Sequence, residues 1–356
     1  MKLLRTISTR RLLAGVLGVV IAGVAGTAIA IAAVGSGPVP QPASLASAIH
    51  AAMQGKSIAG ISANVTFTNN LFAGSSIESA DPLVTGASGR LWATDGHLRL
   101  ELQSDNGDAQ LVVNNNSYWI YDPTSQTLYE GTLQQKSSSS QGSTGGGDQA
   151  LPTVAQIQQS LDRLAKHAGV SGATPTDVGG QPAYSVALTP ATSAGLLGAV
   201  HLSFDANQGI PLDFAIFPRG DSTPALELRA SSVSYGAVPL SDFQISPPAG
   251  SQVVHVSMPQ HSTAGATTPK DRGDVSVVGK GLGSVIVAKH PAAGGAGTGS
   301  GLAGPLPLQS VSVDGVTGRE LPTSLGTVLQ FTRDGVGYLL AGSVTPATLL
   351  SVAKTL

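Results

Sequence analysis

Cysteine is absent from this sequence of 356 residues. The absence excludes disulfide bonds, thiolate metal sites, a cysteine nucleophile and a lipid-modified cysteine near the N-terminus. A chain without such cross-links depends on its hydrophobic core for stability, and this length is sufficient to bury one.

Charge is also scarce. Charged residues make up 11% of the chain, against roughly 25% in an average soluble domain, and the formal net charge is −2. Hydrophobic residues make up 41%, which excludes the highly charged class of disordered protein. No dense Lys/Arg cluster follows residue 11, and aromatic residues are only 4% of the chain. We therefore expect no nucleic-acid partner, whether a duplex or a stacked single strand.

Groups that carry catalysis are sparse and scattered. The nearest two histidines, His255 and His261, have no acidic neighbour, and a metal site needs three or four converging ligands. A glycine-rich run at 277–283 is followed by a strand-like pattern rather than a helix, so it has no mechanism for holding a phosphate. The sequence predicts no enzyme, no metal and no cofactor.

The N-terminal segment, residues 1–34, predicts export. Four basic residues precede an uncharged run of 23 residues at 12–34, which is long enough to cross a bilayer as a helix. The positive flank predicts that the rest of the chain lies outside the cytoplasm. Ala-x-Ala sites at 28–30 and 30–32 leave a cleaved signal peptide and secretion open. We favour an uncleaved anchor, which makes this a single-pass protein of the cell membrane.

After a Pro/Gly/Ser spacer at 35–42, the chain alternates apolar and polar residues with a period of two. The alternation occurs at 61–68, 98–102, 200–204, 212–216 and 226–230. Each run predicts a strand with one buried and one solvent-exposed face, as in an antiparallel sheet. His201 is assigned to the exposed face. Apolar residues at helical spacing predict helices at 45–53 and 152–168, available to cover the sheet.

A second unit is predicted at 274–356. A Pro/Ser/Thr-rich linker at 257–273 precedes it. Its clearest feature is a hairpin in which strands at 327–333 and 336–342 are joined across Asp334-Gly335. A terminal helix is predicted from Pro346.

One ordered set of motifs carries a resemblance to a known family. Residues 178–190, VGGQPAYSVALTP, are similar to a "Gly-x-x-(Ala/Cys)-Tyr-x-Leu-x-Leu-x-Pro" strand. Residues 200–212 resemble an "apolar strand, Asp, turn, Gly-(Leu/Ile)-Pro" segment, and 231–250 a "Tyr-Gly … Phe … Pro-Pro-Gly" element. Together these motifs resemble the bacterial lipoprotein-carrier superfamily, which includes the LolA and LolB carriers, the LppX and LprG lipid-binding lipoproteins and the RseB/MucB sensors.

The resemblance implies an α+β fold for residues 43–256. The expected architecture is a strongly curved, incompletely closed antiparallel β-barrel with helices covering its concave face, followed by the small C-terminal α+β module. An apolar cavity between sheet and helices would accept acyl chains. The candidate lining residues lie on the apolar faces of the predicted strands: Leu98, Leu100, Leu102, Leu202, Phe204, Leu212, Phe214, Ile216, Leu226 and Leu228.

We therefore expect a non-enzymatic, membrane-anchored protein outside the cytoplasm that binds a lipid or an acylated lipoprotein. The missing lipid-modified cysteine departs from the lipoprotein members and favours a protein tethered by its N-terminal helix. Two alternatives remain open. One is an RseB-like sensor that binds an envelope regulatory protein such as an anti-sigma factor, and the other is a structural envelope protein with a filled core.

Overall fold

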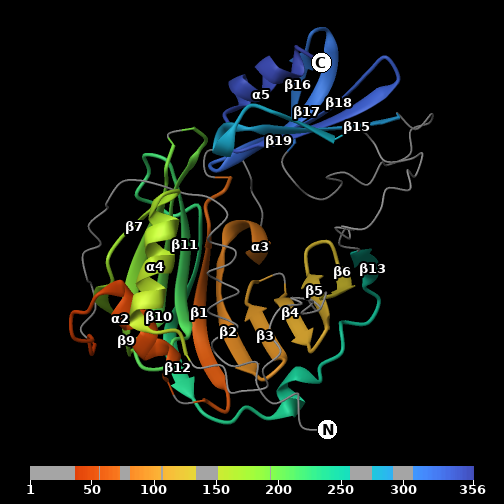
Figure 1. Ribbon diagram of the computed structural model, residues 1–356. Coiled ribbons are helices and arrows are strands. Elements are labelled where there is room, and N and C mark those ends of the chain that lie inside the picture. Colours follow the sequence, from red (N-terminus) through yellow and green to blue (C-terminus); the bar gives the residue numbers. More distant parts are fainter. Residues whose placement is uncertain are drawn as a thin grey trace, which may run out of the picture.

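The computed structural model places the chain in two β-sheets with few helices (Figure 1). It describes residues 37–55, 57–72, 81–105, 107–133, 151–192, 194–256, 275–291 and 308–356. The helices are α2 (Leu45–Met53), α3 (Pro82–Thr85), α4 (Val154–Ala165) and α5 (Pro346–Ala353), with short 3-10 turns η1 (Leu240–Phe243) and η2 (Gly281–Gly283).

The first sheet has 13 strands, in the order β13-β6-β5-β4-β3-β2-β1-β12-β11-β10-β9-β7, with β8 also paired to β9. Their bounds are β1 (Ile61–Asn69), β2 (Ala87–Thr94), β3 (His97–Leu102), β4 (Ala109–Asn114), β5 (Ser117–Asp122), β6 (Thr127–Thr132), β7 (Ala168–Val170), β8 (Thr174–Val178), β9 (Gln181–Pro190), β10 (Leu197–Asp205), β11 (Pro211–Pro218), β12 (Leu226–Tyr235) and β13 (Gln252–Val256). β13 lies parallel to β6 and all other neighbours are antiparallel. The sheet is therefore mixed, and the wholly antiparallel expectation is corrected at this one edge.

The second sheet has six strands, in the order β14-β15-β19-β18-β17-β16. Their bounds are β14 (Val275–Val278), β15 (Val285–Pro291), β16 (Gln309–Val313), β17 (Val316–Thr323), β18 (Gly326–Arg333) and β19 (Val336–Gly342). Asp334 and Gly335 both have positive φ, 51° and 75°, as the tight turn predicted for this hairpin requires. Helix α5 packs on one face of the sheet, where Leu349 is fully buried beside Leu329 and Leu340.

The two sheets are joined directly by backbone hydrogen bonds. The amide of Leu196, before β10, donates to the carbonyl of Ser343 over 2.9 Å, and the amide of Ser324, after β17, donates to the carbonyl of Leu71 over 2.8 Å. The small sheet thus contacts the large one at two places that are far apart in sequence.

Helices α2 and α4 begin where their sequences supply caps. The Ser44 side chain accepts the amide of Ser47 at the start of α2. At α4, Thr153 accepts the amide of Gln156 while the Gln156 side chain accepts the amide of Thr153, a capping box. Both helices lie within the ranges that helical spacing predicted.

These two helices pack against one end of the large sheet. Leu45, Ile49 and Ile157 from the helices form one buried cluster with Tyr184 of β9 and Phe204 of β10. Apolar residues on the helices and on the facing strands leave water together, which holds this end of the fold.

Strands β9 and β10 are buried on both faces, from Ala183 to Pro190 and from Ala199 to Asp205. The assignment of His201 to a solvent-exposed face is therefore wrong, because its exposed fraction is 7%. Its imidazole ring lies 4.4 Å from the Phe217 ring, between ring centroids. The alternation in β10 predicts that its polar residues face solvent. Sequence alternation does not show whether other parts of the chain cover that face, and here they do.

The architecture is mostly β, with a curved large sheet that does not close into a barrel (Figure 1). Helices α2 and α4 cover β9 and β10. Over the strands from β1 to β6, the described residues place the four-residue helix α3, which contacts β1, and the 3-10 turn η1, which contacts β3 and β4.

The predicted single-pass membrane location is contradicted. Within the described ranges, no helix is both long enough and apolar enough to cross a bilayer. The proposed anchor at 12–34 lies outside the described residues.

Candidate functional site

Strand pairing brings nine of the ten candidate lining residues onto one face of the large sheet, which we name the apolar face. Leu98, Leu100 and Leu102 are alternate residues of β3, and the register connects them through β2 and β1 to the other strands. The remaining six on this face are Leu202, Phe204, Phe214, Ile216, Leu226 and Leu228.

Leu212 is the exception. The β10–β11 register shifts between Ser203 and Phe204, so that Phe204 pairs with Pro211 and Leu212 has no partner in β10. Leu212 packs instead with Val178 and Ala183 in a separate cluster. A bulge of this kind changes the side of the sheet to which a side chain points.

The apolar face has two differently covered halves. In the closed half, β9 to β11, helices α2 and α4 cover β9 and β10, and Leu202 and Phe204 have exposed fractions of 7% and 2%. Phe214 and Ile216 of β11 are half-buried. In the open half, β1 to β6, one row of paired residues crosses six strands and every member is only half-buried. The row consists of Ala63, Leu91, Leu100, Leu111, Ile120 and Tyr129.

A second half-buried row runs beside the first. It consists of Ile61, Ala93, Leu98, Val113 and Tyr118. Neither row contains a charged side chain. A cluster around Val65 and Leu102 buries the end of this half near α3, and Ala63, Leu91 and Leu100 of the first row pack against it. The apolar surface that remains partly accessible lies along the two rows.

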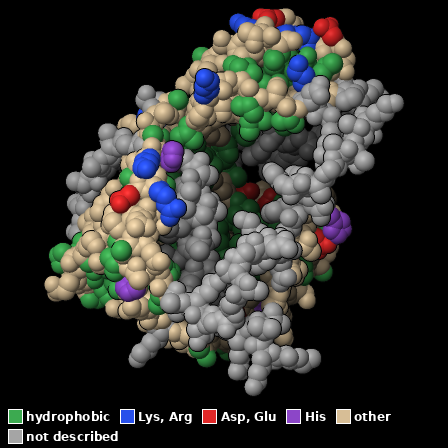
Figure 2. All heavy atoms as spheres, viewed as in Figure 1, with side chains coloured by type: hydrophobic (Ala, Val, Ile, Leu, Met, Phe, Trp, Pro, Cys, Tyr) green, Lys and Arg blue, Asp and Glu red, His purple; other side chains and the backbone are tan. Residues whose placement is uncertain are grey.

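The space-filling view agrees with this division. A hollow opens on the side of the molecule that faces the viewer, below the small sheet, and hydrophobic side chains gather at its base (Figure 2). Such a concave surface, lined with apolar side chains, is the usual form of a site for an apolar ligand.

Several open-half residues were missed from the sequence, among them Leu111, Val113 and Ile120. Leu111 and Val113 are alternate residues of β4. Their spacing is a signal in the sequence, although a pattern of only two residues is short. Residues 118–121 of β5 are Tyr, Trp, Ile and Tyr, apolar on both faces, so no period identifies Ile120 as the residue that shares a face with Leu111.

The charged residues of these strands lie on the opposite face of the sheet. Glu101 of β3 accepts a hydrogen bond from Arg99 over 2.7 Å and lies 3.6 Å from the Arg90 guanidinium. The described part of the chain contains no group of three or more His, Asp or Glu that could hold a metal ion. What the apolar face offers a ligand is therefore hydrophobic contact.

An ion pair between a buried carboxylate and an exposed guanidinium lies on the opposite face of the closed half. Arg229 of β12 donates to Asp213 of β11 over 2.7 Å. Burial raises the pKa of Asp213 to about 6, although the neighbouring Arg229 charge opposes the rise. Burial also lowers the pKa of His201. Asp213 Oδ1 and His201 Nε2 are buried and have no hydrogen-bond partner among the described residues. Removing these two polar atoms from water lowers the free energy of unfolding.

The fold and its exposed apolar rows define a class: an open, curved β-sheet that presents an apolar face, followed by a small second sheet. No protein-family model matches the sequence, and no curated protein matches it.

Solved structures do match. MucB of Pseudomonas aeruginosa, in its complex with MucA, matches over 87% of this chain and 94% of its own, with 17% identity and a TM-score of 0.40. An outer membrane lipoprotein-sorting protein domain from Vibrio parahaemolyticus matches over 52% and 89%, with 11% identity and a TM-score of 0.17. An uncharacterized conserved protein from Thermus thermophilus matches over 55% and 90%, with 11% identity and a TM-score of 0.32. MucB and lipoprotein-sorting domains are among the groups that the sequence motifs resemble.

Proposed function

We propose that this protein binds the acyl chain of a lipid or of an acylated lipoprotein along the open half of its apolar face, without catalysing a reaction. One observation carries the proposal: two adjacent rows of apolar side chains run across the open half and are only half-buried, while α2 and α4 bury part of the closed half of the same face. A contiguous apolar surface that stays partly accessible to water is a candidate for ligand binding.

The energetics suit a long unbranched ligand. Each methylene that leaves water contributes about 0.8 kcal/mol, so a chain of ordinary length can be held without a charged anchor. The rows offer no charged group to orient a headgroup, which favours binding that depends on chain length over recognition of a particular head.

The test measures binding of a dansyl-labelled undecanoic acid to the full chain by fluorescence. Leu111→Gln places an amide in the middle of the first row and should weaken binding about ten-fold, the loss expected when about 1.4 kcal/mol of contact is removed. Ser88→Gln is the matched control, because Ser88 is exposed on β2 and lies on the opposite face. Its affinity should equal that of the unmodified protein.

Two results would overturn the proposal: no saturable binding of the labelled acid, or equal loss of affinity in both variants. Native mass spectrometry of the protein purified from cells provides a second measurement. Lipid that dissociates from the unmodified protein and is lost from Leu111→Gln supports the proposal.

A regulatory protein that binds a protein partner is the second candidate. The exposed fractions of Val275 and Val277 on the edge strand β14 are 68% and 62%, and that of the adjacent Ile286 is 50%. An exposed apolar edge strand favours pairing with another chain. The solved MucB structure contains MucA, and an envelope regulatory partner of that kind is the alternative for this chain. Val277→Lys should abolish capture of such a partner and leave binding of the labelled acid unchanged.

A further inference from the structure

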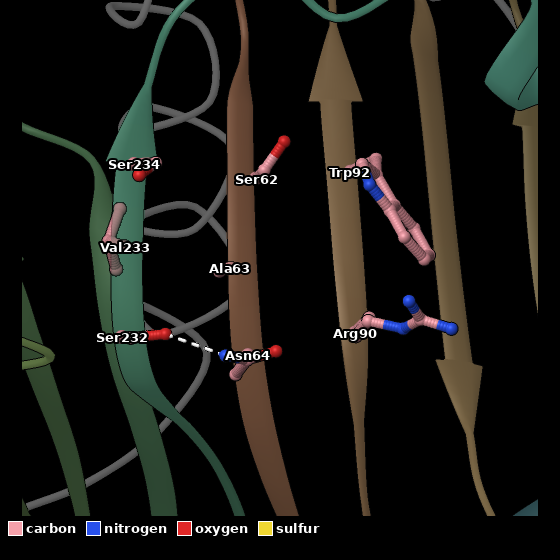
Figure 3. A pocket seen from close by; sticks show the side chains of 8 residues that line it. All are labelled: Ser62, Ala63, Asn64, Arg90, Trp92, Ser232, Val233 and Ser234. Atoms are coloured by element: carbon pink, nitrogen blue, oxygen red, sulfur yellow. Dashed lines mark hydrogen bonds between the residues drawn. The ribbon is translucent and has the colours of Figure 1, made fainter.

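A polar pocket lies on the opposite face of the large sheet, where β12, β1 and β2 run side by side (Figure 3). Its cavity volume is about 220 Å³. Small polar side chains, together with Ala63 and Val233, line it from β1 and β12, and Arg90 and Trp92 line it from β2. The small polar residues are Ser62, Asn64, Ser232 and Ser234.

The indole of Trp92 is held in position by charged neighbours. The guanidinium carbons of Arg90 and Arg99 lie 5.2 and 4.9 Å from the centroid of its ring. Glu101 fixes Arg99 at 2.7 Å, and Arg99 also donates to the backbone carbonyl of Asp242 over 3.2 Å. An aromatic wall fixed in this way loses little conformational freedom when a ligand binds against it.

Glu101 also limits the positive charge of the site. It is within salt-bridge distance of both arginines, so one carboxylate faces two guanidinium groups. Arg90 has 52% of its side chain exposed and Arg99 has 19%. A multiply charged anion would therefore meet two guanidinium groups that already share one carboxylate, which disfavours an anion as the ligand.

The other lining groups both donate and accept hydrogen bonds. Asn64 donates its amide to the Ser232 hydroxyl over 2.9 Å, which fixes the two side chains across β1 and β12. Among the described residues, Asn64 Oδ1 and the hydroxyls of Ser62 and Ser234 have no other partner. Paired donors and acceptors of this kind match the hydroxyl groups of a sugar, each of which is also both donor and acceptor.

We propose that this pocket binds one hexopyranose ring of a saccharide. The apolar C–H face of the ring lies against Trp92, while its hydroxyls bond to Asn64, to the serines and to Arg90. Ser62 and Asn64 alternate along β1 with Ala63, so their side chains point to the side of the sheet opposite the apolar rows. Ala63, a member of the first row, also lines the pocket. Neither Asn64 nor Trp92 belongs to the rows, so the tests of the saccharide site and of the acyl surface use different residues.

The chain contains two tryptophans, which supply both a reporter and an internal control. In the nitrogen-15 spectrum of the full chain, each indole N–H gives one signal, and Trp92→Phe assigns that of Trp92. Trp119 lies on the same face, with β3 and β4 between it and Trp92. Titration with the methyl glycosides of glucose, mannose and galactose should shift the Trp92 signal saturably for at least one sugar and leave the Trp119 signal in place.

Two variants sharpen the measurement. Asn64→Ala should weaken the binding about ten-fold, as loss of a hydrogen-bonding group predicts, with an unchanged circular dichroism spectrum because Asn64 is exposed. Ser88→Ala, on the same face of β2 but outside the pocket, should bind normally. The proposal is overturned if none of the three glycosides shifts Trp92, if inorganic phosphate alone does so, or if Asn64→Ala binds as well as the unmodified chain.

Discussion

The closed and open halves of the apolar face are built from the same alternating sequence pattern and differ in what covers them. In the closed half, Phe204 lies beneath α2 with 2% of its surface exposed. In the open half, Leu111 and Ile120 have comparable apolar side chains, but they are half-buried and belong to no buried cluster. Apolar alternation thus specifies a face, and the helices decide whether that face is buried as core or stays partly accessible to water.

The largest difference between the halves should appear on truncation. Phe204→Ala should lower the free energy of unfolding by about 3–5 kcal/mol, because it leaves a cavity under the helices. Leu111→Ala should cost about 1 kcal/mol or less, since its side chain already contacts water. Urea denaturation of the two variants measures both values. Equal losses would show that the open half is packed like the closed one.

The closed half should also show the stronger pH dependence, through Asp213. Burial raises its pKa from 3.8 to about 6 in the folded protein, so between these values the folded state keeps a proton that the unfolded state has lost. The free energy of unfolding therefore falls as the pH rises through this window, by up to about 3 kcal/mol. Asp213→Asn should remove that fall in urea titrations at pH 4, 5, 6 and 7. Asp221→Asn, at an exposed position in the turn before β12, is the control, and a fall that persists in Asp213→Asn contradicts the assignment.

Enlarging a side chain should also destabilise the closed half more than the open half. Val186→Phe adds volume to the cluster under α2 and α4 and should cost about 1–3 kcal/mol through overpacking. Val113→Phe adds the same volume to the open half, where the change should stay within about 0.5 kcal/mol. Thermal unfolding followed by circular dichroism compares them. A matching loss in Val113→Phe would mean that the second row has no free space in front of it.

A matched pair of tyrosines gives the smallest expected effect. The Tyr184 hydroxyl donates to the backbone carbonyl of Gln41 over 2.6 Å, which ties β9 to the segment before α2. Tyr184→Phe should cost about 1 kcal/mol. Tyr118 of the open half has no such bond among the described residues, so Tyr118→Phe should be neutral. The comparison fails if the second substitution costs as much as the first.

Alternation and capping residues are local properties, and for that reason they could be predicted from the sequence. The helix at 45–53 and the hairpin across Asp334-Gly335 lie where local spacing and turn chemistry placed them. The part of the apolar face on β3 and on β10 to β12 was predictable in the same way, since these strands alternate, whereas β5 is apolar on both faces. Which part of the face the helices cover could not be predicted. Whether a second layer lies over Leu202 or over Leu111 depends on contacts between residues that are distant in sequence.

Three details of the candidate site needed coordinates for the same reason. The bulge that displaces Leu212 is a property of two strands together. The burial of His201 depends on cover over the second face of β10. The polar pocket combines β12 with β1 and β2, and more than 130 residues separate Trp92 from Ser232 in the chain.

The parallel pairing of β13 with β6 has a consequence for self-association. A long β6 with free amides and carbonyls at the border of the sheet would be a template for another chain. The chain after β12 returns across η1 and places β13 on that border, where His255 lies 3.0 Å from Glu130 of β6. The border of the sheet then consists of the five-residue β13, on which Val253, Val254 and Val256 have exposed fractions of 51%, 43% and 39%. The pairing therefore moves the free edge of the sheet onto an apolar strand, where another chain could add.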